Sequence, residues 1–269
     1  MRTGRLLGAG RTADVYELEN KRPRTPQHGE AAQGAGVHGA DRGADVQGVD
    51  RGADAHGAWV LRRYRDGRGD ARAEAEIMEH VRAHGYPVPR VRAATRTDLI
   101  LERLSGPTML EAIAAGALPP AAAGAELARL LHALHALPPR RSTDPATRVL
   151  HLDLHPENVL LAPDGLGVID WANAEEGPPG LDWGMSAVIL AQVAADTADP
   201  RAHLAHTVLT GLLTHQSSSG PSTLTDEGLT EAITRRSKNP TMSTREIRLL
   251  NQVKELIRSA GARVGTTDS

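Results

Sequence analysis

Residues able to do chemistry are concentrated in the segment HLDLHPENVLL, which begins at His151. It places His151, Asp153 and His155 at alternate positions and follows them with Asn158. On a straight strand these three side chains share a face, and two imidazoles with a carboxylate could ligate zinc or iron in a metal-dependent hydrolase. Pro156 argues against this arrangement, because proline restricts the preceding residue and cannot donate to a sheet. A purely structural strand is the other simple interpretation.

A second aspartate downstream favours phosphoryl transfer. Asn158 lies five residues after Asp153, and the turn APDG then leads to VID, which ends at Asp170. This is the spacing of a kinase catalytic loop and its metal-binding aspartate. Phosphoryl transfer needs a carboxylate to deprotonate the attacking hydroxyl, and an amide oxygen and a second carboxylate to hold Mg²⁺. In this interpretation Asp153 is the catalytic base, Asn158 and Asp170 are metal ligands, and His151 orients the loop.

Together with VIDWANAEEGPPGLDWG, this segment resembles the aminoglycoside phosphotransferase family and related small-molecule kinases. The resemblance implies an α+β, bilobal, protein-kinase-like fold, with a small antiparallel-sheet N-terminal lobe and a larger, mostly helical C-terminal lobe. It also implies ATP or GTP with Mg²⁺ as cofactors, and a hydroxyl of an antibiotic or metabolite as acceptor. The aspartate matching Asp182 helps to hold the catalytic loop in that family. From the residues alone, Asp182 would equally well cap the apolar helix that follows it.

The N-terminal segment GRLLGAGRTADVYELE predicts a strand, a glycine turn and a second strand. Gly8, Gly10 and Val15 fit the glycine loop with which kinases cover nucleotide phosphates, although Ala13 stands where a third glycine is usual. A plain hairpin turn explains the same residues. The nucleotide-binding role of this loop therefore depends on what the following strand carries.

The predicted strand Trp59–Tyr64 should carry the lysine that holds the α- and β-phosphates, but no lysine lies between Lys21 and Lys238. Arg62 takes the lysine's place, sharing a face with Val60 by the strand period of two. The missing lysine and third glycine also fit a pseudokinase, a nucleotide-binding module without turnover.

Helical periodicity gives Arg62 a partner. Glu74 lies on the same face as Ile77 in the predicted helix, and an inward carboxylate needs a counter-ion. We expect an ion pair between Arg62 and Glu74, with Glu76 as the second choice of partner. Arg63 should project to the opposite face of its strand. The simpler alternative is that Glu74 lies on a solvated surface.

The chain divides into an N-terminal nucleotide-binding lobe (1–101), a hinge (102–106) and a C-terminal lobe for catalysis and substrate binding (107–269). Glu102 and Leu104, at the hinge, are expected to contact the nucleotide. The segment from about residue 20 to residue 57 contains a tandem repeat, GADRGADVQ followed by GVDRGADAH, and almost no large apolar side chains. This composition predicts a disordered insertion.

Composition narrows the function further. The 269 residues are 40% apolar, contain no cysteine and carry a net charge of −2. A chain of this kind can build a hydrophobic core without disulfides and offers no basic surface for nucleic acid. Lacking a signal segment and an apolar run of about 18 residues, it is expected to be cytoplasmic and not membrane-bound. Glu175 and Glu176 would attract a cationic acceptor. His132 and His135 are expected at the polar edge of a leucine-rich helix.

Overall fold

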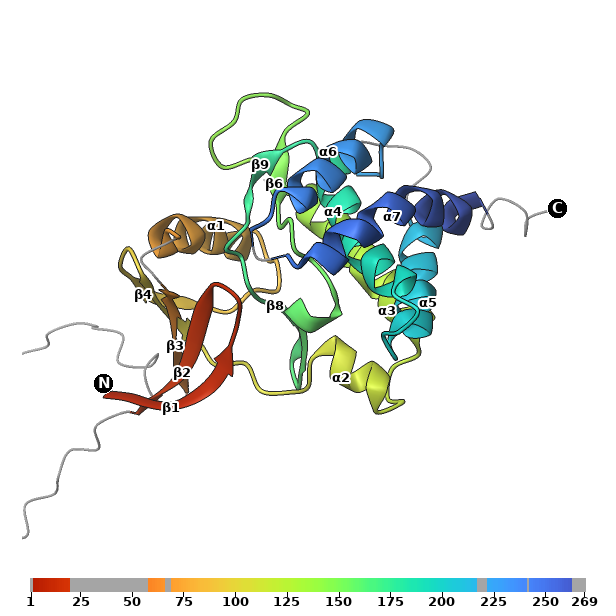
Figure 1. Cartoon of the computed structure of the whole chain (residues 1–269). Helices are drawn as coiled ribbons and strands as arrows, with labels where there is room; N and C mark the ends of the chain where they lie inside the picture. Colours follow the sequence, from red (N-terminus) through yellow and green to blue (C-terminus); the bar gives the residue numbers. More distant parts are fainter. Residues whose placement is uncertain (1, 20–57, 66–68, 217–221, 241, 263–269) are drawn as a thin grey trace, which may run out of the picture.

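The computed structural model describes residues 2–19, 58–65, 69–216, 222–240 and 242–262. The predicted insertion and its tandem repeat lie outside these residues. Strands and one helix come first along the chain and most of the helices follow, as the sequence predicted (Figure 1). None of the described helices is long and apolar enough to cross a membrane.

The N-terminal part is an antiparallel sheet whose strand order is β1-β2-β3-β5-β4. Its strands are β1 (Arg2–Ala9), β2 (Ala13–Glu19), β3 (Trp59–Tyr64), β4 (Val91–Ala94) and β5 (Asp98–Glu102). Both strands around the glycine turn and the strand β3 lie where the sequence predicted them. In the β2–β3 register Val15 pairs with Arg62, so these two side chains occupy the same face of the sheet.

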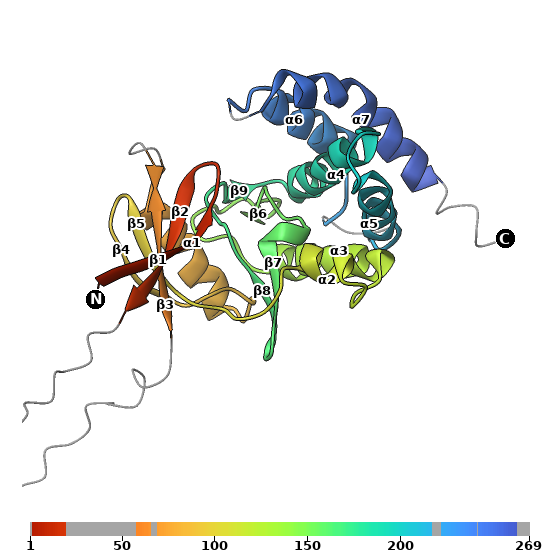
Figure 2. The same cartoon turned by 60° about the horizontal axis from the view of Figure 1, so that its bottom comes forward.

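One helix, α1 (Ala71–Ala83), connects β3 to β4 and packs against the sheet (Figure 2). Asp70 caps its N-terminus by accepting hydrogen bonds from the amides of Arg72 and Ala73. The chain leaves the helix through Gly85, whose φ of 83° is accessible to glycine at little cost. The buried face of α1 includes Glu74 and Ile77, in agreement with the helical period.

The C-terminal part is mostly helical. Its helices are α2 (Met109–Ala114), α3 (Pro120–His135), α4 (Pro179–Ala195), α5 (Ala202–Thr214), α6 (Asp226–Ser237) and α7 (Thr244–Ala262). Helix α4 is almost entirely buried and contacts α5, α6 and α7. Helix α6 lies very close to α4, since a Cβ added to Gly228 would lie 2.3 Å from the carbonyl oxygen of Gly180. This close approach holds the N-terminal half of α6 against α4.

Two short pairs of strands lie between α3 and α4. The first is a hairpin at the turn APDG, formed by β7 (Val159–Ala162) paired with β8 (Gly165–Val168). It follows a single 3-10 turn (Pro156–Asn158), so the segment HLDLHPENVLL is not a straight strand. The second pair, β6 (Arg148–Leu150) with β9 (Glu175–Gly177), was not predicted from the sequence. Its strands of three residues are too short to show a period of two.

Local sequence signals mark the start of two helices. Capping boxes are present, Thr108 with Glu111 and Ser243 with Glu246. Strand β4 was not predicted from the sequence, and the leucine-rich helix α3 begins at Pro120. The first residues of α3 are mostly small alanines, which carry little periodic signal.

Candidate active site

The segment HLDLHPENVLL is held in a loop by its own side chains. The Asn158 amide nitrogen donates to the backbone carbonyl of Asp153 at 2.9 Å, with a longer contact of 3.3 Å to its carboxylate. In this orientation the amide nitrogen of Asn158 is engaged within the loop, and its amide oxygen is the acceptor atom of that side chain. Leu152 has a φ of 61°, which is unusual for a branched residue and turns the chain sharply before Asp153.

Asp182 fixes the backbone of this loop. Its carboxylate accepts hydrogen bonds from the amides of His151 (2.9 Å) and Leu152 (2.7 Å). It is completely buried, and its pKa is nevertheless lowered below the ordinary 3.8, because burial is outweighed by these bonds and by His135. Helix α4 begins after Pro178 and has no side-chain cap, so Asp182 does not act as the helix cap.

Helix α3 supplies a third donor to Asp182. Nε2 of His135 lies 3.1 Å from the Asp182 carboxylate, and Nδ1 lies 2.9 Å from the Ser222 hydroxyl. The indole of Trp183 donates to the same hydroxyl. The prediction that His135 lies at a polar helix edge is therefore wrong, because its side chain is buried. It lies four residues after Leu131, on the helical face that packs inward, and this spacing could have revealed it.

The ring of His151 has both nitrogens engaged within the protein. Nδ1 accepts from the amide of Asp153 at 3.2 Å, and Nε2 lies 3.1 Å from the carbonyl oxygen of Ile169. Burial lowers the pKa of His151, which favours the neutral ring. Among the described residues no group of three or more histidines and carboxylates is arranged to hold a metal. The hydrolase interpretation based on His151, Asp153 and His155 is therefore contradicted by the geometry.

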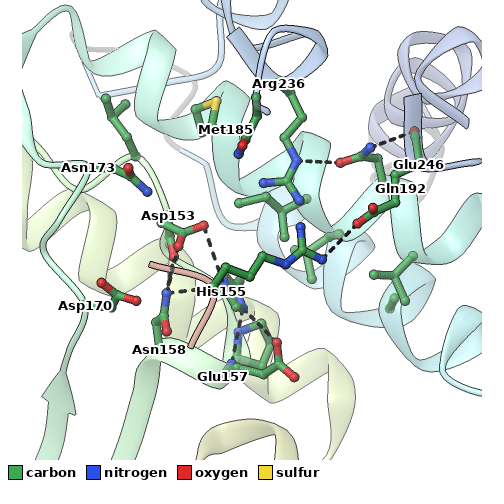
Figure 3. Close-up of a pocket in the computed structure, with 18 of the residues that line it drawn as sticks. Asp153, His155, Glu157, Asn158, Asp170, Asn173, Met185, Gln192, Arg236 and Glu246 are labelled. Atoms are coloured by element: carbon green, nitrogen blue, oxygen red, sulfur yellow. Dashed lines mark hydrogen bonds and ion pairs between the residues drawn. The ribbon is translucent and has the colours of Figure 1, made fainter. Parts of the chain in front are cut away.

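Asp153 faces a cavity of about 820 Å³ together with Asn158 and Asp170 (Figure 3). Burial is the main cause that raises the pKa of Asp153 to about 7, and the nearby charge of Asp170 acts in the same direction. Asp170 itself has a φ of 61°, and Asp153 directly follows Leu152, which has the same φ. Both acids therefore lie at sharp turns of the backbone. The spacing of 17 residues along the chain thus brings one carboxylate, one amide and a second carboxylate to the same cavity.

The predicted ion pair between Arg62 and Glu74 is present. One nitrogen of the Arg62 guanidinium donates to Glu74 at 2.8 Å, and the other donates to Asp170 at 2.6 Å. Tyr64, two residues further along β3, donates its hydroxyl to the same Glu74 oxygen at 2.7 Å. Burial is the largest influence on Glu74 and raises its pKa, while Arg62 opposes this shift. Arg62 therefore connects the sheet, helix α1 and the catalytic region.

The other candidates around this pair lie elsewhere. Glu76 does not contact Arg62 but pairs with Arg140 (2.7 Å) and Arg141 (2.8 Å). Arg63 is exposed and pairs with Asp98 on the far face of β3, as its place in the strand predicted. Tyr64 was not predicted as a site residue, although the strand period of two places it on the face of Arg62.

The glycine turn borders a second cavity, which is also lined by Val15, Arg62 and Asp170. The amide of Gly10 donates to the carbonyl of Ala13, which closes the turn tightly. The other residues predicted to contact the nucleotide line neither of these two cavities. Val60 is buried in the sheet, Glu102 binds Arg90, and the Leu104 side chain packs over Gly167 of β8.

The larger cavity extends from Asp153 to the helical part of the molecule, on the side away from β3. Its apolar lining comes mostly from α4 and α5 and includes Met185, Ile189, Leu190, Leu204 and Val208. The acids expected to attract a cation have protein partners instead. Glu175 binds Arg235 at 2.7 Å, and Glu176 accepts from the backbone amides of residues 140–142.

Comparison with known proteins defines the class. The model of the family described as "Phosphotransferase enzyme family" matches residues 37–146 and 141–216. Because these matches span more than half of the chain, the protein belongs to that family. Its fold is the protein-kinase-like fold of the small-molecule phosphotransferases.

Solved structures of similar fold include amicoumacin kinase hAmiN in complex with AMP-PNP, Ca²⁺ and Ami, with a TM-score of 0.50 and 13% identity over 95% of this chain and 88% of that one. A thermostable mutant of aminoglycoside phosphotransferase APH(4)-Ia matches with a TM-score of 0.47 and 11% identity, over 95% and 94% of the two chains. Choline kinase LicA from Streptococcus pneumoniae matches with 0.45 and 12%, over 78% and 84%. No curated protein sequence gives a significant match.

Proposed function

We propose that this protein transfers the γ-phosphoryl group of ATP or GTP to a hydroxyl of a small molecule. The observation that carries the proposal is the presence of Asp153, Asn158 and Asp170 on one cavity, with Arg62 bound to Asp170. These groups are the base, the two oxygen ligands and the phosphate-binding cation that phosphoryl transfer requires.

In this proposal Asp153 accepts the proton of the acceptor hydroxyl. The hydroxyl oxygen bonds to the γ-phosphorus, the bond from that phosphorus to the bridging oxygen breaks, and the nucleoside diphosphate leaves. Asn158 and Asp170 have the oxygen donors that Mg²⁺ prefers, and Mg²⁺ would neutralise charge on the phosphate oxygens when bound. Asp182 and His151 act on the chemistry indirectly, since they hold the loop that presents Asp153.

The nucleotide is proposed to lie between the glycine turn and the catalytic loop. Gly8, Gly10 and Val15 would cover the phosphates, and Arg62 would bind them while Glu74 keeps its guanidinium in place. We further propose that residues 1–101 and 107–269 act as two lobes joined at 102–106. Val60, Glu102 and Leu104 line neither cavity, and we propose that they contact the nucleotide base where the sheet meets that junction, since Val60 pairs with Leu101.

The pseudokinase alternative rests on Arg62 in place of lysine. Arginine keeps the positive charge and can donate to two acceptors at once, as it does here to Glu74 and Asp170. Together with the complete set of Asp153, Asn158 and Asp170, this favours turnover over nucleotide binding alone.

A nucleotide-consumption screen tests the proposal. Purified protein is incubated with Mg-ATP or Mg-GTP and with aminoglycosides, macrolides, choline-like amines or hydroxylated amino acids. The release of ADP or GDP is measured. At least one acceptor should stimulate release in the wild type and not in Asp153→Asn. Stimulation that persists in Asp153→Asn would show that another group is the base.

A further inference from the structure

Within the part of the chain that the structure describes, one arginine of the larger cavity, Arg236, lacks the ion-pair partner that the other arginines there have. Arg236 lies in the last turn of α6, and Nε of its guanidinium donates to the Gln192 side chain at 2.6 Å (Figure 3). Gln192 is neutral and is itself held by the backbone carbonyl of Glu246 at 3.1 Å. Among the described residues, no carboxylate lies within 4.0 Å of the Arg236 guanidinium at salt-bridge distance.

The other charged side chains on this cavity behave differently. Apart from Asp153, every carboxylate that lines it has an arginine partner among the described residues. The pairs are Asp170 with Arg62, Glu157 and Asp199 with Arg201, Glu175 with Arg235, Asp196 with Arg245, and Glu246 with Arg11. Among the described carboxylates and arginines that line the cavity, Asp153 and Arg236 are therefore the two that lack a direct ion pair of this kind.

Arg236 is partly buried, and its charge has no direct ion-pair partner among the described residues. Burial lowers the pKa of Arg236, the more distant charges of Asp153 and Glu246 oppose this shift, and Arg11 acts in the same direction as burial. A partly buried guanidinium without a direct salt bridge is stabilised by a bound anion, and two of its nitrogens remain to make such a contact. Asp153 attracts Arg236 across the cavity but makes no direct salt bridge with it.

The position of Arg236 identifies the side from which the anion comes. Arg236 lines the larger cavity at the end formed by α4, α5 and α7, whereas Arg11 and Thr12 of the glycine turn also line this cavity, and Arg236 does not line the second cavity beneath that turn. In Figure 3 Asp153 lies between Asp170, the proposed metal ligand, and Arg236. The anion thus belongs to the acceptor side and not to the nucleotide phosphates.

We infer that the acceptor is a hydroxy acid, whose hydroxyl faces Asp153 and whose carboxylate binds Arg236. The apolar side chains of α4 and α5 would contact an aliphatic or aromatic body, and a cavity of about 820 Å³ is large enough for a drug-sized molecule. This inference rests on the proposed kinase function, since it assigns the acceptor of the same reaction. It replaces the cationic acceptor expected from Glu175 and Glu176, whose carboxylates are bound by the protein.

Direct binding tests the inference without relying on turnover. A set of aliphatic and aromatic hydroxy acids, including phenyllactate, is compared with the matching primary amides by calorimetry on the full chain. For at least one pair the acid should bind the wild type about 10- to 100-fold more tightly than its amide, the range given by a charge-assisted hydrogen bond. If no acid in the set binds more tightly than its amide, the inference is wrong.

Variants of Arg236 test whether this residue causes the preference for the acid over the amide. Arg236→Gln should weaken binding of the preferred acid about 10- to 100-fold and change amide binding less than about threefold, while Arg236→Lys should retain part of the preference. Arg235→Gln is the matched control, because Arg235 is the preceding residue, also lines the cavity and is paired with Glu175 and Glu231. An unchanged preference in Arg236→Gln, or an equal loss of acid and amide binding, would overturn the assignment.

The release of ADP or GDP is measured with the same compounds as acceptors. If the acids bind through Arg236 but none is phosphorylated, the kinase proposal fails and the anion site remains. If neutral hydroxyl compounds are phosphorylated as efficiently as the acids, the kinase proposal stands and the acceptor assignment fails.

Discussion

Two carboxylates, Glu74 in helix α1 beside the sheet and Asp182 in helix α4, are both buried, but their pKa values are shifted in opposite directions. Glu74 is 4% exposed and has its pKa raised above the ordinary 4.5. Asp182 is 0% exposed and has its pKa lowered below the ordinary 3.8. Burial favours the neutral form of both, so the difference comes from their hydrogen-bond donors and from neighbouring charges, among which Asp170 raises the pKa of Glu74.

The donors differ in distribution. Asp182 receives bonds on both oxygens, from two backbone amides and from His135. Both side-chain donors to Glu74, from Arg62 and Tyr64, reach the same oxygen, and the backbone of Trp171 adds a weaker contribution. Asp182 is therefore suited to fixing a backbone permanently. Glu74 holds a cation whose second contact, to Asp170, lies at the proposed metal site.

The largest effect is expected at Asp182. Asp182→Ala leaves two buried amides and His135 without an acceptor, and should lower the free energy of unfolding by about 3–5 kcal/mol. Urea unfolding measures this loss. Asp164→Ala, in the exposed β7–β8 turn, is the control and should change the same quantity by less than about 0.5 kcal/mol. A loss below about 1 kcal/mol for Asp182→Ala would remove the distinction between the two carboxylates.

A smaller loss of stability is expected at Arg62. Arg62→Ala leaves the buried Glu74 without its counter-ion. Because the pKa of Glu74 is already raised, its carboxyl group can take up a proton, which limits the loss of unfolding free energy to about 1–3 kcal/mol. Nucleotide binding should weaken as well, and Arg62→Lys should recover much of the activity.

Melting temperature and nucleotide affinity measure both consequences for Arg62. Arg63→Ala is the matched control, since Arg63 is exposed on the opposite face and pairs only with Asp98 among the described residues. A silent Arg62→Ala together with a damaging Arg63→Ala would show that the functional register of β3 is shifted by one residue.

The dependence of stability on pH sharpens the comparison. Because the folded pKa of Asp182 is below 3.8, its contribution is fully present above that pH and is lost as the pH falls through the folded pKa. The difference in unfolding free energy between the wild type and Asp182→Asn should therefore be constant from about pH 5 to 7 and shrink below about pH 4. Urea unfolding across this range tests it, and a difference that grows in acid would contradict the assignment.

The smallest effect is expected from the segment between β2 and β3. Leu18 and Trp59 are paired neighbours, so a short connection can join the two strands. Deleting residues 24–56 should leave the melting temperature within about 2 °C of the wild type and retain activity, because loop-closure entropy varies slowly with length. A large drop in melting temperature would show that the segment contributes to the packing of the sheet.

The sequence predicted the groups that are close along the chain or related by a simple period. Spacing alone identified Asp153, Asn158 and Asp170 as a set, and the helical period gave Glu74 as the partner of Arg62. It did not predict the contact of His135 with Asp182, because the two residues are 47 positions apart on different helices. Such contacts depend on how α3 and α4 pack, which local patterns do not encode.

Arg236 shows that local sequence patterns also fail to predict which charges at the site have partners. Nothing in the sequence around it separates it from Arg235, and both line the cavity, yet Arg235 pairs with Glu175 whereas Arg236 has no direct carboxylate partner among the described residues. The residue next to Arg236 is the neutral Gln192 of α4, so the difference arises from how α6 packs against α4. Charge neutralisation in a cavity can be judged only when the partners of every charged group are known.

Calorimetric titration with Mg-nucleotide tests the central claim, that Asp153 is the base and Asp170 a metal ligand of one phosphoryl-transfer site. Asp153→Asn should bind Mg-ATP or Mg-GTP within about threefold of the wild type while losing turnover, and Asp170→Ala should bind it at least about tenfold more weakly. Equal nucleotide affinities in the wild type and Asp170→Ala, or wild-type turnover in either variant, would contradict this account.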